Sequence, residues 1–308
     1  MQETGRILDC MNGAALELQQ GQWNSLARAL RDDRDWITAR EQSLHFLSLA
    51  LGLAHGARSR KVSLFLAAEG RRICSASLRR HHCLIASVEG VLADPVMDQA
   101  RSLIELAFQA FYLLRSTDPN QAALDAFNLS AIRWAGDRQR LLEAGLLPAD
   151  TLDLKGDHKR AQVEENVFSK YAGRRPRFYA DKTAQQTAKA AGLEKAYELT
   201  YGALSGFLHG SPMAERNLTL PKPGANIELA AVPSRGLLDM MWTAFAVGSQ
   251  AAVIATIGGL ATFVEVDPKF AIALIEQFHA AYPNDWEPEL HTLAVAWGLK
   301  WRSDSVSG

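Results

Sequence analysis

Apolar residues recur three and four positions apart along almost the whole chain, as in residues 101–114, RSLIELAFQAFYLL. That spacing gathers apolar side chains on one face of an α-helix, whereas the strict alternation of a β-strand is scarce. We therefore expect an all-α fold, a multi-helix bundle. The chain has 308 residues, 48% of them hydrophobic, so it can bury a large core. The expected helices cover residues 12–30, 35–56, 61–82, 84–92, 95–116, 120–144, 157–171, 183–191, 193–210, 234–265, 268–281 and 287–301.

One stretch breaks the helical pattern. Residues 217–233, NLTLPKPGANIELAAVP, place Pro-Lys-Pro-Gly-Ala-Asn between two short extended runs. Proline and glycine in these positions favour a turn, which predicts a short loop or β-hairpin inserted in the bundle. For the domain organisation, we expect residues 1–60 to form an N-terminal helical cap and residues 61–308 to form the main helical domain, which contains a polar cleft.

Residues 242–264, WTAFAVGSQAAVIATIGGLATFV, carry no charge and are long enough to cross a bilayer. Most of them are Ala, Gly, Thr and Ser rather than Leu, and Gln250 lies in the middle of the segment. This composition suits a closely packed buried helix better than a lipid-exposed one, so we expect no membrane contact. The same surface is a candidate seam for a homodimer or another protein partner.

Charge and cysteine content limit the partners and the cellular location that the sequence predicts. The chain has 33 Lys and Arg against 34 Asp and Glu, a net charge of −1, so a local patch would have to bind RNA or another anionic ligand. Only three cysteines are present, and the opening MQETGRILDC lacks the basic and apolar runs of a secretion signal. These features predict a cytoplasmic protein.

The group Cys74, His81, His82 and Cys83 is the best candidate for a metal site. The adjacent histidines would point about 100° apart on a helix, and the spacings typical of zinc ligands do not occur. The chain also lacks a phosphate-cradling Gly-rich loop and a dinucleotide-binding fingerprint. We expect neither a metal nor a cofactor.

The helix expected over residues 95–116 carries a polar stripe on an otherwise apolar surface. Its members, which fall on one face, are Arg101, Glu105, Gln109 and Tyr112. Arg101 and Glu105 lie one turn apart, close enough for an ion pair. On so apolar a helix such a pair faces the protein interior or a cleft. The residues leave open whether the pair is purely structural or has a function.

The helix expected over residues 193–210 repeats a four-residue spacing. Tyr201, Ser205 and His209 follow one another at this spacing, beside glycines at positions 202, 206 and 210. Glycines one turn apart leave a groove without side chains, so another backbone or a flat ligand can approach Ser205 and His209. The alternative is that the glycines only permit helix packing and that His209 bonds a neighbouring carbonyl.

The segment GRRPRFY, residues 173–179, combines arginines with aromatic residues. Arg174, Arg175 and Arg177 can hold phosphates while a neighbouring ring stacks on a base, the usual combination for single-stranded nucleic acid. A solvated loop with extended arginine side chains is the alternative.

The two polar helices together resemble a known pattern. Arg101-x-x-x-Glu105 is followed about a hundred residues later by Tyr201-x-x-x-Ser205-x-x-x-His209. This combination resembles an uncharacterised bacterial family of helical proteins over about residues 60–215. That family is similar in outline to HEPN proteins, helical domains that include metal-independent ribonucleases of toxin and antiviral systems. HEPN nucleases carry the arginine and the histidine on one helix, whereas here they lie on separate helices.

The resemblance implies that Arg101 and His209 act as a functional pair in such a system. As a ribonuclease, the protein would use His209 as general base or acid at the RNA 2′-hydroxyl and Arg101 to stabilise charge on the phosphate. Glu105 would orient Arg101, and Ser205 and Tyr201 would contact the substrate. The competing expectation is a non-catalytic ligand-sensing or protein-interaction module, in which the Arg/Glu/Ser/His cluster is structural.

Overall fold

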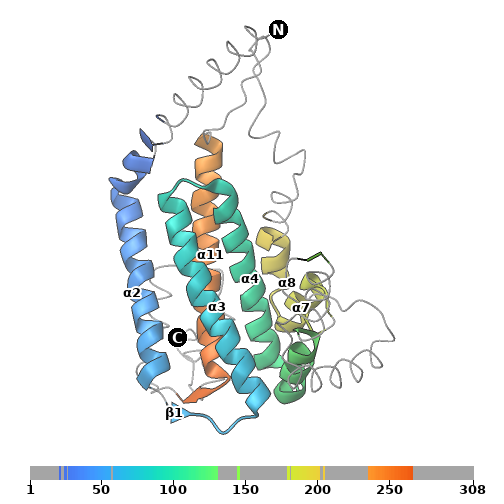
Figure 1. Ribbon diagram of the computed structural model, residues 1–308. Coiled ribbons are helices and arrows are strands. Elements are labelled where there is room, and N and C mark those ends of the chain that lie inside the picture. The colour runs from blue at the N-terminus through green and yellow to red at the C-terminus, as the bar shows by residue number, and fades with distance from the viewer. Residues whose placement is uncertain are drawn as a thin grey trace, which may run out of the picture.

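The computed structural model is helical, with one sheet of two short strands among the residues that it describes, which confirms the all-α prediction (Figure 1). The described residues are 21, 24–25, 27–56, 58–130, 144–145, 179–180, 182–201, 204 and 235–265. In chain order the elements are α2 (Arg34–Gly56), β1 (Arg58–Ser59), α3 (Leu64–Glu89), α4 (Ala93–Arg115), α7 (Ala184–Ala191), α8 (Glu194–Ala196), the π-helical turn η2 (Tyr197–Tyr201), α11 (Arg235–Ala261) and β2 (Val264–Glu265). The predicted helices over residues 35–56 and 95–116 correspond to α2 and α4 to within two residues.

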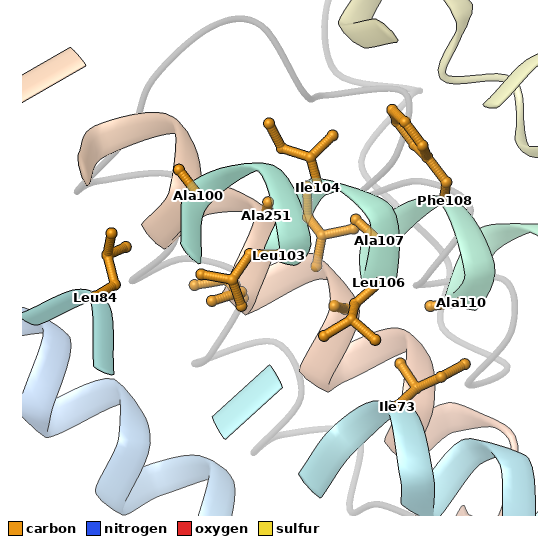
Figure 2. Close-up of a cluster of buried hydrophobic side chains, with 14 of the residues drawn as sticks. Ile73, Leu84, Ala100, Leu103, Ile104, Leu106, Ala107, Phe108, Ala110 and Ala251 are labelled. Atoms are coloured by element: carbon orange, nitrogen blue, oxygen red, sulfur yellow. The ribbon is translucent and has the colours of Figure 1, made fainter. Parts of the chain in front are cut away.

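The centre of the bundle is formed by α3, α4 and α11, which run side by side in Figure 1. The side chains between these helices are apolar and fully buried. Figure 2 shows Ile73 and Leu84 of α3, Leu103 and Ala107 of α4, and Ala251 of α11 in this cluster. Because α11 packs along both other helices, it takes up one face of each.

Aromatic contacts join α2 to α11. The fully buried Trp36 meets Trp242 and Phe245 edge to face, with ring centroids 5.7 and 5.1 Å apart. Such aromatic pairs each contribute about 0.5–1.5 kcal/mol beyond the burial of their area. The division of the chain near residue 60 into a cap and a main domain stays a prediction.

α3 is one continuous helix, whereas the sequence pattern predicted two helices, over residues 61–82 and 84–92. That prediction was wrong because the apolar face of the helix runs on without a break. Leu84, Ile85 and Val88 all continue it and are all buried. The residues up to Glu89 therefore gain core contacts by staying helical.

A tight turn joins α3 to α4 in an antiparallel hairpin. Val91 in this turn has φ 54°, a left-handed conformation that is costly for a β-branched residue. Its side chain is fully buried, and burial of a valine contributes about 1.5–3 kcal/mol, which offsets the strain. The hairpin sets residues of the two helices opposite one another, such as Arg80 and Gln99, which share a hydrogen bond.

Glycines allow α11 to approach its neighbours closely. A Cβ atom at Gly259 would lie 2.8 Å from the backbone oxygen of Gly70 and 3.0 Å from the backbone nitrogen of Cys74, both on α3. On the α4 side, a Cβ atom at Gly258 would lie 2.9 Å from the Cβ atom of Ala110. These distances are shorter than normal contacts of a methyl group, so α11 owes its position to the missing side chains.

By length and composition alone, Met240–Ala261 within α11 could cross a membrane. In the structure, 83% of its most apolar stretch is buried inside the protein, against α3 and α4. The burial agrees with the closely packed helix that the small residues predicted. The expected absence of membrane contact stays a prediction.

A buried polar seam runs between α3 and α11. Ser77 Oγ accepts a hydrogen bond from Thr256 Oγ1 at 3.0 Å, and one turn further along His81 Nε2 lies 3.3 Å from Ser249 Oγ. The imidazole of His81 is 1% exposed. Burial, assisted by the charge of His82, lowers the pKa of His81 to about 4. His81 is therefore neutral at pH 7.

The helix predicted over residues 183–191 is confirmed as α7. Thr183 caps its start in a reciprocal pair with Gln186, and Gly192, at φ 73°, ends it. The helix predicted over residues 193–210 begins as α8 but continues as the π-helical turn η2. The pattern did not predict this change of helix type.

The helix predicted over residues 234–265 ends earlier, at Ala261. The next residues turn, and β2 pairs antiparallel with β1, with Arg58 opposite Glu265. Strands of two residues are too short to produce an alternating pattern, so the sequence did not predict them. The predicted segments outside the described residues are the helices over residues 157–171, 268–281 and 287–301 and the loop or hairpin over residues 217–233.

Replacing Gly259 by alanine should destabilise the protein, because the added methyl group would overlap backbone atoms of α3. We expect the free energy of unfolding to fall by about 1–3 kcal/mol, measured by urea denaturation. Gly52→Ala in α2 is the matched control, since nothing lies within 4 Å of its Cβ position. This control should raise stability by about 0.5–1 kcal/mol. Equal effects of the two substitutions would contradict the close packing of α11 on α3.

The neutral state of His81 makes stability depend on pH. Its pKa is about 4 in the folded protein against 6.5 in the unfolded chain, so the unfolded chain binds more protons below pH 6.5. Stability therefore falls as the pH drops from 6.5 toward 4, and His81 should account for about 2 kcal/mol between pH 7.5 and 5.0. Urea titrations at both pH values should show a smaller loss for His81→Gln. His82→Gln, at an exposed position, should keep most of the loss, because burial is the larger cause of the lowered pKa. An unaltered pH dependence in His81→Gln would refute this assignment.

Candidate functional site

Three of the predicted site residues, Arg101, Glu105 and Tyr201, lie together, and we term them the Arg–Glu–Tyr cluster. The Tyr201 hydroxyl accepts a hydrogen bond from Arg101 Nη2 at 3.0 Å and donates one to Glu105 Oε1 at 2.7 Å. Arg101 Nε lies 3.4 Å from Glu105 Oε1, and the guanidinium carbon lies 5.1 Å from the centre of the Tyr201 ring. Tyr201 is 96 positions from Glu105 in the chain, so only the fold brings it here.

The π-helical turn presents Tyr201 to α4. Tyr197 and Tyr201 stack on each other, with ring centroids 5.1 Å apart and planes inclined by 23°. Both rings pack against Phe108 of α4, at centroid distances of 6.3 and 6.0 Å. Single π turns inside helices are frequent at functional sites. Because both tyrosine rings pack on Phe108, they hold the Tyr201 hydroxyl in a defined position beside Arg101 and Glu105.

Partial burial sets the charge states of the cluster. The side chains of Arg101 and Glu105 are 23% and 20% exposed. Burial raises the pKa of Glu105 above its usual value, although the Tyr201 hydrogen bond and the Arg101 charge act in the opposite direction. Burial and the hydrogen bond to Glu105 raise the pKa of Tyr201 to about 12. The phenol of Tyr201 is therefore protonated at neutral pH and acts as a donor to the carboxylate.

A cavity of about 520 Å³ lies between α3 and α4, with Glu105 in its wall, and we term it the α3–α4 cavity. The residues that line it recur at spacings of three and four on each helix, so each helix turns one face toward it. On α3 this face lies opposite the one that packs on α11. Its polar lining also includes Arg72, Arg79 and Arg80 of α3 and Gln99, Ser102 and Gln109 of α4.

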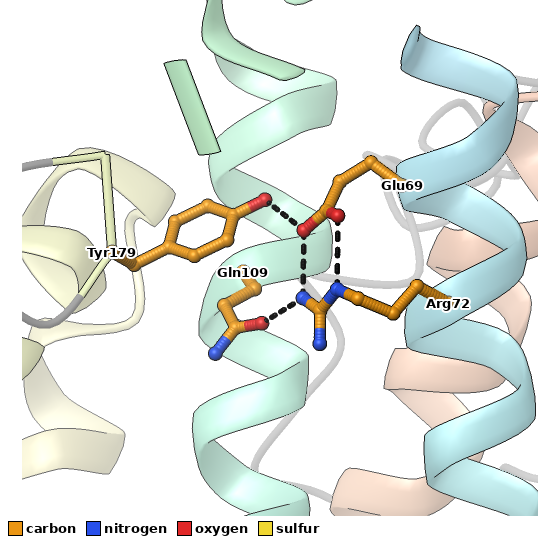
Figure 3. Close-up of polar contacts among 4 residues, drawn as sticks. All are labelled: Glu69, Arg72, Gln109 and Tyr179. Atoms are coloured by element: carbon orange, nitrogen blue, oxygen red, sulfur yellow. Dashed lines mark hydrogen bonds and ion pairs between the residues drawn. The ribbon is translucent and has the colours of Figure 1, made fainter. Parts of the chain in front are cut away.

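A second polar cluster borders the cavity, as Figure 3 shows, and we term it the Glu69 cluster. Arg72 donates from Nε and Nη2 to the two carboxylate oxygens of Glu69, at 2.9 and 2.6 Å, and from Nη2 to Gln109 Oε1. The Tyr179 hydroxyl donates to Glu69 Oε1 at 2.8 Å. Glu69 is only 5% exposed, so these donors compensate a buried negative charge. Burial and the charge of Glu69 raise the pKa of Tyr179 well above its usual value.

The other predicted site residues lie outside the described part of the chain. They are Ser205, His209, Arg174, Arg175 and Arg177. Their roles stay predictions.

The residues considered for a metal site have other surroundings. Cys74 is buried in the core, which raises the pKa of its thiol to about 12, and His81 belongs to the polar seam. In the part of the chain that the structure describes, no group of three His, Cys, Asp or Glu side chains is arranged to hold a metal ion.

Comparison with known proteins gives one match. Residues 82–224 match the model of a family of unknown function, DUF5677. The searches of curated proteins and of solved structures found no match. The matched residues include the Arg–Glu–Tyr cluster as well as Ser205 and His209, and they begin just after Arg80. The match agrees with the resemblance to an uncharacterised family, whereas a bacterial origin and a HEPN-like relationship stay predictions.

Sequence reasoning did not assemble the α3–α4 cavity. Arg72, Arg79 and Arg80 all lie within the helix predicted over residues 61–82, but no local pattern shows that their face lies against α4 around a cavity. The available signal was the spacing of four and seven residues from Arg72 through Ala76 to Arg79. The contact between Tyr179 and Glu69, 110 positions apart, has no local signal at all.

Replacing Tyr201 by phenylalanine should lower the free energy of unfolding by about 1–2 kcal/mol, because Arg101 and Glu105 each lose a hydrogen bond in a partly buried place. Tyr197→Phe is the matched control, since it keeps the ring stack and its hydroxyl bonds no described residue. That control should change stability by less than about 0.5 kcal/mol. Chemical denaturation of both variants tests the difference, and equal losses would show that the Tyr201 hydroxyl is not a specific contact.

Proposed function

We propose that this protein binds RNA and cleaves it without a metal ion, as the HEPN-like nucleases that its polar helices resemble do. The observation that supports the proposal is the contact of the Tyr201 hydroxyl with Arg101 and Glu105. This contact joins the two chain segments on which the resemblance rests. Ser205 and His209 follow Tyr201 by four and eight positions in the same segment.

The cluster keeps hydrogen-bonding capacity for a substrate. Arg101 Nε is buried beside Glu105, but the side chain is 23% exposed and its Nη1 makes no hydrogen bond to any described residue. A guanidinium with a spare donor can bind a phosphate oxygen. Glu105 also lines the α3–α4 cavity, whose arginines favour a negatively charged ligand.

In the proposed reaction, His209 takes the proton of a 2′-hydroxyl and the 2′-oxygen attacks the adjacent phosphorus. The bond from phosphorus to the 5′-oxygen breaks, and the leaving oxygen takes a proton from water. The products are a 2′,3′-cyclic phosphate and a 5′-hydroxyl end. Arg101 stabilises the charge on the phosphate, Glu105 and Tyr201 hold the guanidinium, and Ser205 contacts the substrate.

The proposal also concerns the biological system and the partners of the protein. It assigns the protein to a toxin or antiviral defence system of the cytoplasm, with RNA or another anionic ligand as its partner and no cofactor. Arg174, Arg175 and Arg177 would hold further phosphates of a single strand. A homodimer or a partner protein is compatible with this role.

Incubation with a single-stranded RNA of about 20 nucleotides in excess chelator tests the proposal. We expect cleavage products with 2′,3′-cyclic phosphate ends, and no cleavage of the same strand with 2′-deoxyriboses. His209→Ala should lower the cleavage rate at least about 100-fold, and Arg101→Ala should lower it by about 10²–10³. The readout is the first-order rate from gel electrophoresis at saturating protein.

Matched variants control for charge and folding. His82→Ala removes an exposed histidine of α3, and Arg34→Ala removes an exposed arginine at the start of α2, so both should cleave at the wild-type rate. Circular dichroism must show that the variants are folded. Full cleavage by folded His209→Ala, or no cleavage by wild-type protein, would reject the nuclease proposal.

A second function is kept because the Arg–Glu–Tyr cluster already satisfies most of its own charges and hydrogen bonds. Mutual satisfaction is what a structural pair in a ligand-sensing or protein-interaction module requires. In that case Arg101→Ala should lower the melting temperature by several degrees, and no RNA should be cleaved by any variant.

A further inference from the structure

The α3–α4 cavity has few acceptors left for a ligand. The carboxylate in its wall, Glu105, already accepts a hydrogen bond from Tyr201 at 2.7 Å. The amide oxygens of Gln99 and Gln109 accept hydrogen bonds from arginines of α3. A ligand that donates hydrogen bonds would therefore compete with contacts inside the protein.

The two glutamine amides turn their donors away from the arginines. Arg80 Nη1 donates to Gln99 Oε1 at 3.1 Å, and Arg72 Nη2 donates to Gln109 Oε1. A guanidinium can only donate, so the amide oxygen must face it and the orientation of each amide is fixed. Figure 3 shows the amide nitrogen of Gln109 turned away from Arg72. Neither amide nitrogen donates to any residue that the structure describes.

Charge in the cavity is also unbalanced. Glu69 balances Arg72, and Glu105 lies in an ion pair with Arg101. Arg79 is exposed and forms no hydrogen bond or ion pair with a described residue. Arg80 donates to the neutral Gln99 and forms no ion pair with a described residue, although its charge acts on Glu105 from a distance. The four arginines at positions 72, 79, 80 and 101 thus face the two carboxylates of Glu69 and Glu105, and this excess of two positive charges suits a dianion better than a single negative charge.

The size and apolar lining indicate more than a bare ion. At about 520 Å³, the cavity lies within the range of roughly 300–1,000 Å³ that is usual for small-ligand sites. A phosphate group alone occupies a small part of that volume. Ala76 and Leu106 add apolar surface to the wall, against which the rest of an organic ligand can pack.

We propose that the α3–α4 cavity binds a phosphate monoester, with Arg79 and Arg80 at its two negative charges and with Gln99, Ser102 and Gln109 donating to its oxygens. The 5′-phosphate of an RNA strand and a small phosphorylated molecule carry this same group. Only the first of these sources rests on the proposed function. The assignment of the phosphate group itself stands on the donors and charges of the cavity.

Binding to the full chain tests the proposal, with His209→Ala as the background so that no strand is cut. The probes are ribose 5-phosphate, a five-nucleotide RNA with a 5′-phosphate and the same RNA with a 5′-hydroxyl, measured by calorimetry at 0.15 M ionic strength. We expect the phosphorylated strand to bind at least about tenfold more tightly than the hydroxyl strand. Equal affinity of ribose 5-phosphate and the phosphorylated strand would identify a small molecule as the source, and a much tighter strand would identify the strand end.

Substitutions of residues that line the cavity are compared with a substitution outside it. Arg79→Gln should weaken binding of the phosphorylated probes at least about tenfold. Arg34→Gln, at an exposed arginine of α2, should leave the affinity unchanged. Ser102→Ala, which removes one neutral donor, should weaken binding by about two- to tenfold.

The proposal is overturned if no phosphorylated probe binds, or if Arg79→Gln and Arg34→Gln change the affinity equally. Its outcome is separate from that of the nuclease assay. Binding without RNA cleavage by the wild-type chain would retain the phosphate site and reject the proposed function. Cleavage without a preference for phosphorylated probes would retain the proposed function and reject the phosphate site.

Discussion

The close approach of α11 to the α3–α4 hairpin is the constraint on which the rest of the described structure depends. At Gly258 and Gly259 the neighbouring helices come so near that a methyl group has no room. α11 covers one face of α3 and one face of α4, and apolar residues of both helices are buried on that side. The polar faces that remain then line the α3–α4 cavity.

The two polar clusters beside the cavity share the same arrangement of side chains. In the Glu69 cluster and in the Arg–Glu–Tyr cluster, a carboxylate on the hairpin pairs with an arginine on its own helix and accepts a hydrogen bond from a distant tyrosine. Each tyrosine hydroxyl fastens a later segment of the chain to α3 or α4. Since the carboxylates are engaged in this way, the cavity between them is left with unused donors. In the proposed phosphate site, the same contacts that stabilise the fold therefore leave donors that favour an anion.

The family match covers the Arg–Glu–Tyr cluster but only part of the α3–α4 cavity. Residues 82–224 include Arg101, Glu105 and Tyr201, while the cavity arginines at positions 72, 79 and 80 precede the matched region. The Arg–Glu–Tyr cluster lies in the part that matches the family of unknown function. The arginines of α3 come from outside the match and belong to the proposed phosphate site. A nuclease and a ligand-sensing module both use an anion site, and they differ in whether a proton is moved at the phosphate.

The sequence by itself determined the helical class, the extents of α2, α4 and α7, and the shared face of Arg101 and Glu105. These features depend on residues within a few turns of one another, which a period of 3.6 reveals. Only the tertiary structure decided that Tyr201 rather than a nearer residue bridges that pair, that Tyr179 bonds Glu69, and that the arginine face of α3 lies against α4 around the cavity. Those contacts join residues about a hundred positions apart, or depend on burial by α11, and no local pattern encodes which distant side chain will fill a given place.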